Sequence, residues 1–266
     1  LPGNISSQFV SALLLISPLA EVGVTIRLTT PLESRSYVLM TLECLEKFGI
    51  KVKSTKDLGE FEVSKQTYKP AKYQVEGDWS SASYLLSLGA LSGEIKVENL
   101  HSESRQGDKI ILEFLRDMGA SVTIDKTSVT VKRQRLGAIR ADLSDCIDLL
   151  PTMAVLAAVA DGVSEFTGIE RARLKESNRV SALKEGLKRL SIKATEEQNK
   201  LTVTGSQPKG AVIDTRADHR IAMAFSMLGA VTGGVIIDEA ECVSKTYPEF
   251  WDIMKSLGSE VKIDGK

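Results

Sequence analysis

The chain of 266 residues is 42% hydrophobic, which is enough to bury a substantial core in one large or two medium domains. Its 34 Lys and Arg residues balance 35 Asp and Glu residues, and the net charge of −1 excludes a global basic surface for nucleic acid. The longest apolar stretches, residues 9–15 and 153–160, are shorter than the roughly 20 residues that a membrane-spanning helix needs. Because the chain as a whole is close to neutral, any anion must bind at a local cluster of positive charge.

The first predicted unit begins with a small polar cluster, Ser6-Ser7-Gln8, that runs directly into an apolar helix. A β-like run at residues 24–28 follows, then a polar loop, and then an amphipathic helix at 37–48. This second helix stops at Gly49, a typical C-cap residue, before short strands.

The same order of elements recurs three more times along the chain. Helices open at residues 80, 148 and 218, β-like runs lie at 95–97, 162–166 and 234–237, and second helices lie at 108–118, 180–190 and 248–257. These second helices stop at Gly119, Ser191 and Gly258, so a unit of about 70 residues repeats. Each unit is predicted as strand, helix, strand, helix, strand, strand, which indicates an α/β fold with helices covering sheets.

The polar segment 64–73, which contains Pro70, interrupts the repeat and predicts a domain boundary near residues 74–76. We therefore expect one domain at 1–74 and a second, three-unit domain at 75–266.

The three cysteines are far apart and form no CxxC pair, which favours free thiols in a reducing compartment, by default the cytoplasm. Leu1 is not a methionine, and the residues after it lack the features of a signal peptide. We expect the chain to start inside a longer protein.

A cluster of cations marks residues 173–179, Arg-Leu-Lys-Glu-Ser-Asn-Arg. Lys175 and Arg179 are four residues apart, so on a helix they share one face, with Glu176 nearby. A solvated helix face explains such a pattern in an ordinary helix. In this chain the second helix of every other unit also follows a polar loop, around Ser34, Arg105 and Lys245. Repeat units tend to place such loops on one face of the protein, which favours a site.

Polar residues at the helix openings have two interpretations. Ser6 and Ser7 suit an N-cap, but hydroxyls and free N–H groups at a helix start also suit a phosphate. The cluster at residues 80–83 has the same form, and the sequence leaves open which of the two clusters is structural.

Asp148 lies among apolar residues, where burying a carboxylate costs free energy unless it caps a helix or takes part in a site. His219 has no partner motif for a metal site, and no phosphate-binding GxxxxGK[ST] or GxGxxG loop is present.

Five motifs together resemble the 5-enolpyruvylshikimate-3-phosphate synthases, a family of enolpyruvyl transferases. The motifs are Asn4-Ile5-Ser6-Ser7-Gln8-Phe9, the segment from Val75 to Tyr84, Arg173-Leu174-Lys175-Glu176-Ser177-Asn178-Arg179, Asp218-His219-Arg220-Ile221-Ala222-Met223, and Lys245-Thr246-Tyr247-Pro248. The resemblance covers the whole chain. It implies an inside-out α/β barrel of repeated βαβαββ units, with about four of the family's six units present and substrates bound between two domains. The chain would then be the carboxy-terminal portion of such an enzyme.

The resemblance also implies the chemistry. The carboxyvinyl group of phosphoenolpyruvate would pass to the 5-hydroxyl of shikimate 3-phosphate, releasing phosphate, without metal or organic cofactor. Its catalytic residues would be Asp148, which accepts the hydroxyl proton, Glu176, which donates a proton to the vinyl carbon, and Lys245, which serves with Glu176 again when phosphate leaves. The remaining assignments are to substrates: Ser6, Ser7, Gln8, Ser34, Asp148 and Lys175 to shikimate 3-phosphate, and Gln8, Arg179, Arg220 and Lys245 to phosphoenolpyruvate.

One position departs from the family pattern: Arg171 stands where many members carry an asparagine near the shikimate ring.

Two other functions remain open. UDP-N-acetylglucosamine enolpyruvyl transferase shares the fold and the chemistry, although the motifs at 175–179 and 218–223 fit the shikimate enzyme better. Alternatively, the chain is a non-catalytic module that binds ligand, or only its other half. We expect the isolated chain to be inactive, the full-length protein to be a monomer, and neither nucleic acid nor membrane to be a partner.

Overall fold

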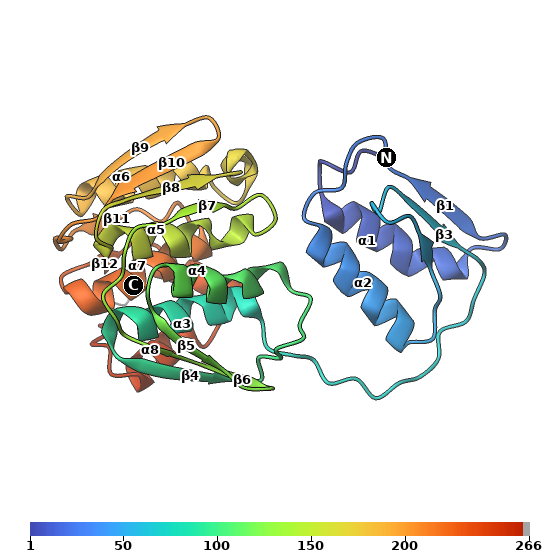
Figure 1. Ribbon diagram of the computed structural model, residues 1–266, viewed down its shortest axis with the longest axis horizontal. Helices are drawn as coiled ribbons and strands as arrows, with labels where there is room; N and C mark the ends of the chain where they lie inside the picture. Colours follow the sequence, from blue (N-terminus) through green and yellow to red (C-terminus); the bar gives the residue numbers. More distant parts are fainter. Residues whose placement is uncertain (263–266) are drawn as a thin grey trace. The chain divides into compact units, whose positions relative to one another are not determined.

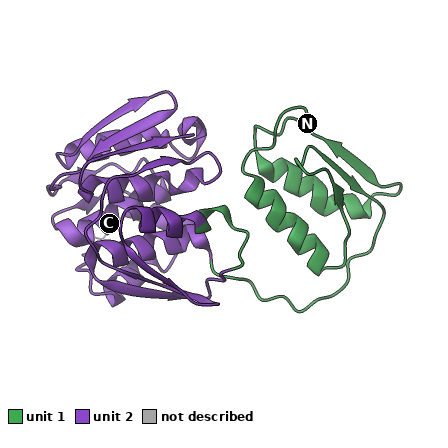
Figure 2. Ribbon diagram, in the orientation of Figure 1, with its two compact units in different colours: residues 1–77, 103–109 green, residues 78–102, 110–266 purple. Residues whose placement is uncertain are grey.

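The computed structural model describes residues 1–262, which form two compact units (Figure 2). The first unit comprises Leu1–Gly77 together with Glu103–Lys109, and the second comprises Asp78–Ser102 and the chain from Ile110. The chain thus passes from one unit to the other at Gly77, close to the boundary expected near residues 74–76. The assignment of the two parts to domains of a larger six-unit fold stays a prediction.

The first unit is a two-layer α/β structure (Figure 1). Its elements are α1 (Ser7–Ile16), the 3-10 helix Ser17–Leu19, β1 (Val24–Arg27), α2 (Arg35–Lys47), β2 (Lys53–Ser54) and β3 (Glu60–Val63). The strands form an antiparallel sheet in the order β1-β3-β2, with Val24 opposite Val63. Val10 and Leu14 of α1 and Leu45 of α2 pack into one core with Phe61 of the sheet.

The second unit contains three successive repeats. The elements of the first are α3 (Trp79–Ser92), β4 (Glu94–Glu98), α4 (Ile111–Asp117), β5 (Ser121–Ile124) and β6 (Ser128–Lys132), with a 3-10 helix Gly107–Ile110 before α4. The second has β7 (Arg140–Asp142), the 3-10 helix Ile147–Leu149, α5 (Leu150–Val159), β8 (Val163–Thr167), the 3-10 helix Glu170–Leu174, α6 (Arg179–Arg189), β9 (Lys193–Glu197) and β10 (Lys200–Thr204). The third has β11 (Val212–Ile213), α7 (His219–Thr232), β12 (Ile236–Ile237), the 3-10 helix Ala240–Lys245 and α8 (Phe250–Ser256).

Helices α3, α5 and α7 contact one another at the centre of this unit, and its sheets lie outside them (Figure 1). The sheets have the orders β4-β6-β5, β7-β8-β10-β9 and β11-β12; β7 and β8 pair in parallel and β8 and β10 antiparallel, with Thr167 opposite Lys200. In α5 every residue except Val159 is buried. A helix that is apolar on all sides is typical of a core element, and this arrangement confirms the inside-out α/β fold that the resemblance implied. The layering predicted from the repeat alone, with helices covering the sheets, is wrong for this unit, because its central helix α5 is apolar on all sides.

The predicted helix stops are confirmed by the backbone. Gly49, Gly119 and Gly258 have φ angles of 81°, 98° and 89°, and Ser191 takes the same left-handed conformation at 64°. A residue in the left-handed conformation directly after a helix ends the helix and turns the backbone towards the next segment. The repeat seen in the sequence is therefore a repeat of the structure, although within residues 1–262 only the repeat from β7 to β10 has all six predicted elements.

Shortening a side chain in the central helix α5 is expected to destabilise the second unit. Leu156 is fully buried, so Leu156→Ala removes packed atoms that neighbouring helices cannot replace, and it should lower the free energy of unfolding by about 2–5 kcal/mol. Urea unfolding measures this loss. Val163→Ala, at a position 49% exposed, is the control and should cost much less; equal losses would contradict the central position of α5.

Candidate active site

Arg179, the first residue of α6, lies at the centre of a charged cluster in the second unit. Its side chain is 1% exposed, yet it donates to three carboxylates. Nε lies 2.8 Å from Asp218 Oδ2, Nη1 lies 2.8 Å from Asp148 Oδ1, and Nη2 lies 2.5 Å from Glu176 Oε2. A planar guanidinium with several donors can satisfy such a set at once.

Asp218 anchors this cluster from the start of α7. It is fully buried, and as the N-cap residue it accepts from the backbone N of Arg220 at 3.0 Å. The hydroxyl of Ser177 also donates to Asp218, at 2.9 Å. We had not predicted a site role for Asp218, although an aspartate just before an apolar helix is a recognisable N-cap signal.

Asp148 lies in the 3-10 helix before α5 and joins three cations. Besides Arg179, it lies 3.3 Å from Arg220 Nη2 and 3.7 Å from Lys175 Nζ. It makes no capping bond to α5, so the capping interpretation of this residue is wrong. Burial acts to raise the pKa of Asp148, but Arg220, Lys175 and Arg179 outweigh it and hold the pKa below its ordinary value.

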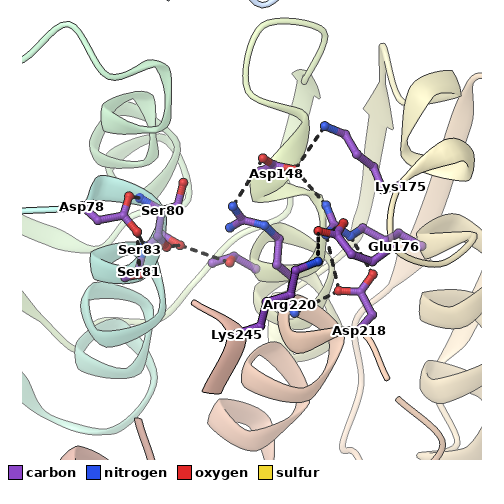
Figure 3. Close-up of polar contacts among 12 residues, drawn as sticks. Asp78, Ser80, Ser81, Ser83, Asp148, Lys175, Glu176, Asp218, Arg220 and Lys245 are labelled. Carbon is purple, nitrogen blue, oxygen red and sulfur yellow. Dashed lines mark hydrogen bonds and ion pairs between the residues drawn. The ribbon is translucent and has the colours of Figure 1, made fainter. Parts of the chain in front are cut away.

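Glu176 connects Arg179 to Lys245, whose Nζ lies 3.0 Å from Glu176 Oε1 (Figure 3). Burial again acts to raise its pKa, but Arg179 and Lys245 lower it from 4.5 to about 2. In this geometry Glu176 is an ionised acceptor at neutral pH.

The acid stability of the protein is expected to depend on Glu176. Because its pKa is lowered in the folded protein, the stability it contributes is complete above about pH 4.5 and is lost as pH falls towards 2. Glu176→Gln should therefore differ most from the parent above pH 4.5, and the difference should shrink as pH falls. Urea unfolding across this range measures the effect. Glu98→Gln, on the exposed face of β4, is the matched control; a Glu176→Gln difference that is independent of pH would contradict the pairing.

The prediction that Lys175, Glu176 and Arg179 share a helix face is wrong. A 3-10 helix ends at Leu174, Lys175 is extended with ψ −156°, and α6 begins only at Arg179. The side chain of Asn178 accepts from Ser181 N and so caps α6. Short polar side chains that bond locally in this way favour helix starts over helix interiors. Lys175 and Arg179 meet instead at Asp148 Oδ1, and Arg179 bonds Glu176 directly.

The neighbouring arginines point to different partners. Arg173 donates to Glu196 Oε2 at 2.8 Å and to backbone carbonyls after β9. Arg171, at the position where an asparagine is typical, donates to the carbonyl of Ser144 at 2.6 Å. Arg171 thus ties the 3-10 helix Glu170–Leu174 to the loop that precedes Asp148.

The predicted shikimate 3-phosphate residues of the first unit lie at two helix starts. Ser6 is the N-cap of α1 and its Oγ accepts from Gln8 N at 3.2 Å, which confirms the capping interpretation without testing a binding role. Ser7 is buried and Gln8 is exposed. Ser34 precedes α2 in a left-handed conformation with φ 52°, an unfavourable state that is often kept at functional positions.

The similar cluster at the start of α3 is held mainly by local bonds, and Ser83 Oγ also lies 3.3 Å from the hydroxyl of Thr152 in α5. Asp78 caps the helix by accepting from the backbone N of Ser80 and of Ser81, both at 3.1 Å. Ser81 Oγ donates to Asp78, and Ser83 Oγ donates to the carbonyl of Ser80 (Figure 3). Of the two serine clusters, this one therefore has a clear structural role.

Two observations concern metals and membranes. His219 is buried, and within residues 1–262 no group of three or more His, Cys, Asp or Glu side chains is placed to hold a metal ion. In the same range, none of the helices has the length and apolar character needed to cross a bilayer.

Comparison with known proteins identifies relatives along the whole chain. Residues 1–254 match the family described as EPSP synthase (3-phosphoshikimate 1-carboxyvinyltransferase). A 3-phosphoshikimate 1-carboxyvinyltransferase of Dehalococcoides mccartyi strain 195 is 51% identical over 261 residues, and one of Methanosarcina acetivorans is 45% identical over 267 residues. Each match covers 98% of this chain and 62% of the relative.

A solved structure of EPSP synthase from Acinetobacter baumannii is similar in fold, with a TM-score of 0.84 at 26% identity. The alignment covers 98% of this chain and 62% of that one. The chain therefore spans about 62% of the length of the relatives that it matches.

Proposed function

The chain belongs to the EPSP synthase family, and from this we propose that it forms the carboxy-terminal portion of a 3-phosphoshikimate 1-carboxyvinyltransferase. The observation that carries the proposal is the charged cluster of the second unit. It gathers four cations, Lys175, Arg179, Arg220 and Lys245, around the three carboxylates Asp148, Glu176 and Asp218. This excess of positive charge suits substrates that carry phosphate and carboxylate groups.

In the proposed reaction the 5-hydroxyl oxygen of shikimate 3-phosphate bonds to the central carbon of phosphoenolpyruvate. Asp148 takes the hydroxyl proton, and Glu176 with Lys245 supplies a proton to the methylene carbon, which gives a tetrahedral intermediate. The bond to the phosphate oxygen then breaks and a methyl proton returns to the protein, so the vinyl group is restored. Phosphate and 5-enolpyruvylshikimate 3-phosphate are the products. The low pKa of Asp148 suits an acceptor that is ionised at neutral pH.

Substrate roles follow the distribution of charge. We assign Arg179, Arg220 and Lys245, with Gln8, to phosphoenolpyruvate, because guanidinium groups can meet a carboxylate or phosphate bidentately. Lys175 and Asp148 are assigned to shikimate 3-phosphate, with Ser6, Ser7, Gln8 and Ser34 of the first unit as further ligands. No cofactor is required by this chemistry.

The chain alone is proposed to be inactive, and the complete enzyme to be a cytoplasmic monomer. The length of the relatives supports the first point, since more than a third of each lies outside the match. Cys44, Cys146 and Cys242 are all free thiols, which suits a reducing compartment.

Phosphate release from phosphoenolpyruvate tests the proposal. The chain is assayed alone and after mixing with the part of the Dehalococcoides mccartyi relative that it does not cover. Phosphate release that needs the mixture and shikimate 3-phosphate is the expected result. Release that needs UDP-N-acetylglucosamine instead would overturn the choice of acceptor, and release by the chain alone would overturn the need for the remaining part.

A further inference from the structure

The turn that joins β9 to β10 bonds to the site loop, which we define as residues 168–178 between β8 and α6. This turn consists of only two residues, Gln198 and Asn199. Asn199 Oδ1 accepts from the backbone N of Ile169 at 2.8 Å and from that of Glu170 at 3.1 Å. Gln198 Nε2 donates to Glu170 Oε1 at 2.7 Å. The two turn residues therefore hold the start of the site loop.

Arg173 makes the reverse contact, from the site loop to the hairpin. Its side chain is 22% exposed, and Nη1 lies 2.8 Å from Glu196 Oε2 of β9. Its Nη2 and Nε donate to the backbone carbonyls of the next two residues, at 2.6 and 3.2 Å. Lys184 of α6 bonds the same carboxylate, at 3.3 Å. The hairpin is thus bonded to the chain on both sides of Lys175 and Glu176.

The first unit contains the same type of contact between a hairpin turn and a loop. Arg35 follows Ser34 at the start of α2, and its guanidinium donates to the carbonyls of residues 56 and 57, in the turn between β2 and β3, at 3.4 and 3.1 Å. In both units an arginine near the start of the second helix therefore bonds the backbone of the turn between the last two strands. An arrangement that recurs at equivalent places of two repeats is a property of the fold.

We propose that the turn between β9 and β10 positions the site loop through Asn199 and Arg173, so that Lys175 and Glu176 are held at the charged cluster. Residues 175–178 lie between the 3-10 helix that ends at Leu174 and α6, so no helix fixes their backbone. Bonds from a rigid hairpin supply that constraint. The inference rests on the proposed function, because that function assigns Lys175 to shikimate 3-phosphate and Glu176 to proton transfer.

Hydrogen exchange of backbone amides tests the contact in the 266-residue chain. Asn199→Ala removes the acceptor of two backbone N–H groups, and because the residue is exposed, the hairpin itself should stay folded. The amides of Ile169 and Glu170 should then exchange about ten-fold faster or more. Asn199→Asp keeps an oxygen that can accept from both groups, so exchange there should stay within about three-fold of the parent.

Thr202→Ala is the control for a general loosening of the hairpin. Thr202 lies within β10, opposite Glu165 of β8 and Thr195 of β9. This change should leave the exchange of the amides at 169 and 170 as in the parent. Unchanged exchange in Asn199→Ala, or an equal rise in Thr202→Ala, would overturn the positioning role.

The consequence for turnover is tested in the mixture of the chain with its complementing part. Asn199→Ala should lower kcat by about ten-fold and raise the KM for shikimate 3-phosphate, because a displaced loop misplaces both Lys175 and Glu176. The KM for phosphoenolpyruvate should stay nearly unchanged, since its proposed ligands in the second unit lie outside the site loop. Asn199→Asp should recover most of the lost kcat, and Thr202→Ala should keep the parent value.

Two kinetic results would overturn the inference: a parent-like kcat in Asn199→Ala, or equal changes in the two KM values. A lower kcat that Asn199→Asp does not recover would also overturn it, because the acceptor oxygen would then not be the cause. An inactive parent mixture would reject the proposed function, whereas hydrogen exchange in the chain alone still decides whether the turn holds the site loop.

Discussion

Asp148→Asn is expected to lower kcat of the complemented enzyme by about 10²–10⁴-fold, the usual contribution of a positioned proton acceptor. The amide keeps the size of the carboxylate, but it cannot take the proton of the attacking hydroxyl. Its single oxygen can accept from only one of Arg179 and Arg220, which bond different oxygens of Asp148. Steady-state phosphate release measures the effect. The KM values should change less than kcat, because asparagine retains the shape and one of these two contacts.

Asp252→Asn is the matched control for this prediction. Asp252 lies on α8 with its side chain 86% exposed, and the same change there should leave kcat unaltered. If Asp148→Asn keeps kcat within about three-fold of the parent, Asp148 does not act as the proton acceptor.

Arg179→Met is expected to destabilise the second unit by about 3–5 kcal/mol, because it leaves buried carboxylates without their cation. Asp218 is fully buried and Asp148 is 15% exposed, so water cannot replace the lost guanidinium. Methionine has a similar length, which limits the loss from packing. Urea unfolding of the chain measures the free energy.

The control for Arg179→Met is Arg189→Met, at the exposed end of the same helix. Arg189 pairs with Glu185 four residues earlier with its side chain 42% exposed, and such a pair contributes at most about 1 kcal/mol. Adding Asp218→Asn to Arg179→Met should restore part of the lost stability, since it removes one uncompensated charge. Equal losses at Arg179 and Arg189 would contradict the central place of Arg179 in the cluster.

The repeat and the helix ends could be predicted from the sequence because they depend on local chemistry. Gly49, Gly119 and Gly258 each follow an amphipathic stretch, and the backbone there takes the left-handed form that glycine favours. Ser191 could be predicted to end the third of these helices only from its position in the repeat, since serine is not a typical residue there. Periodicity thus predicted a residue that composition alone would have missed.

The charged cluster could be predicted only in part. The residue types at 148, 175, 176, 179, 220 and 245 suggested an anion site, but their mutual contacts depend on tertiary packing. Glu176 and Lys245 are 69 residues apart and meet because equivalent loops of two repeats come together. The helical face proposed for Lys175 and Arg179 was wrong because the side chain of Asn178 caps α6, so the helix begins only at Arg179, while Ser177 bonds Asp218, 41 residues away. Asp218 stands in one of the motifs, but nothing in the sequence indicated that its carboxylate would bind Arg179.

The measurement that tests the central claim most directly is ³¹P nuclear magnetic resonance of the complemented chain with phosphoenolpyruvate and shikimate 3-phosphate. The account predicts that the phosphoenolpyruvate signal is replaced by inorganic phosphate in equal amount, while a phosphomonoester signal persists at a shifted position as the shikimate moiety gains its enolpyruvyl group. Both changes should be slower by about 10²–10⁴-fold when Asp148→Asn is used. Unchanged phosphoenolpyruvate in a folded mixture, or phosphate released without shikimate 3-phosphate, would contradict the account.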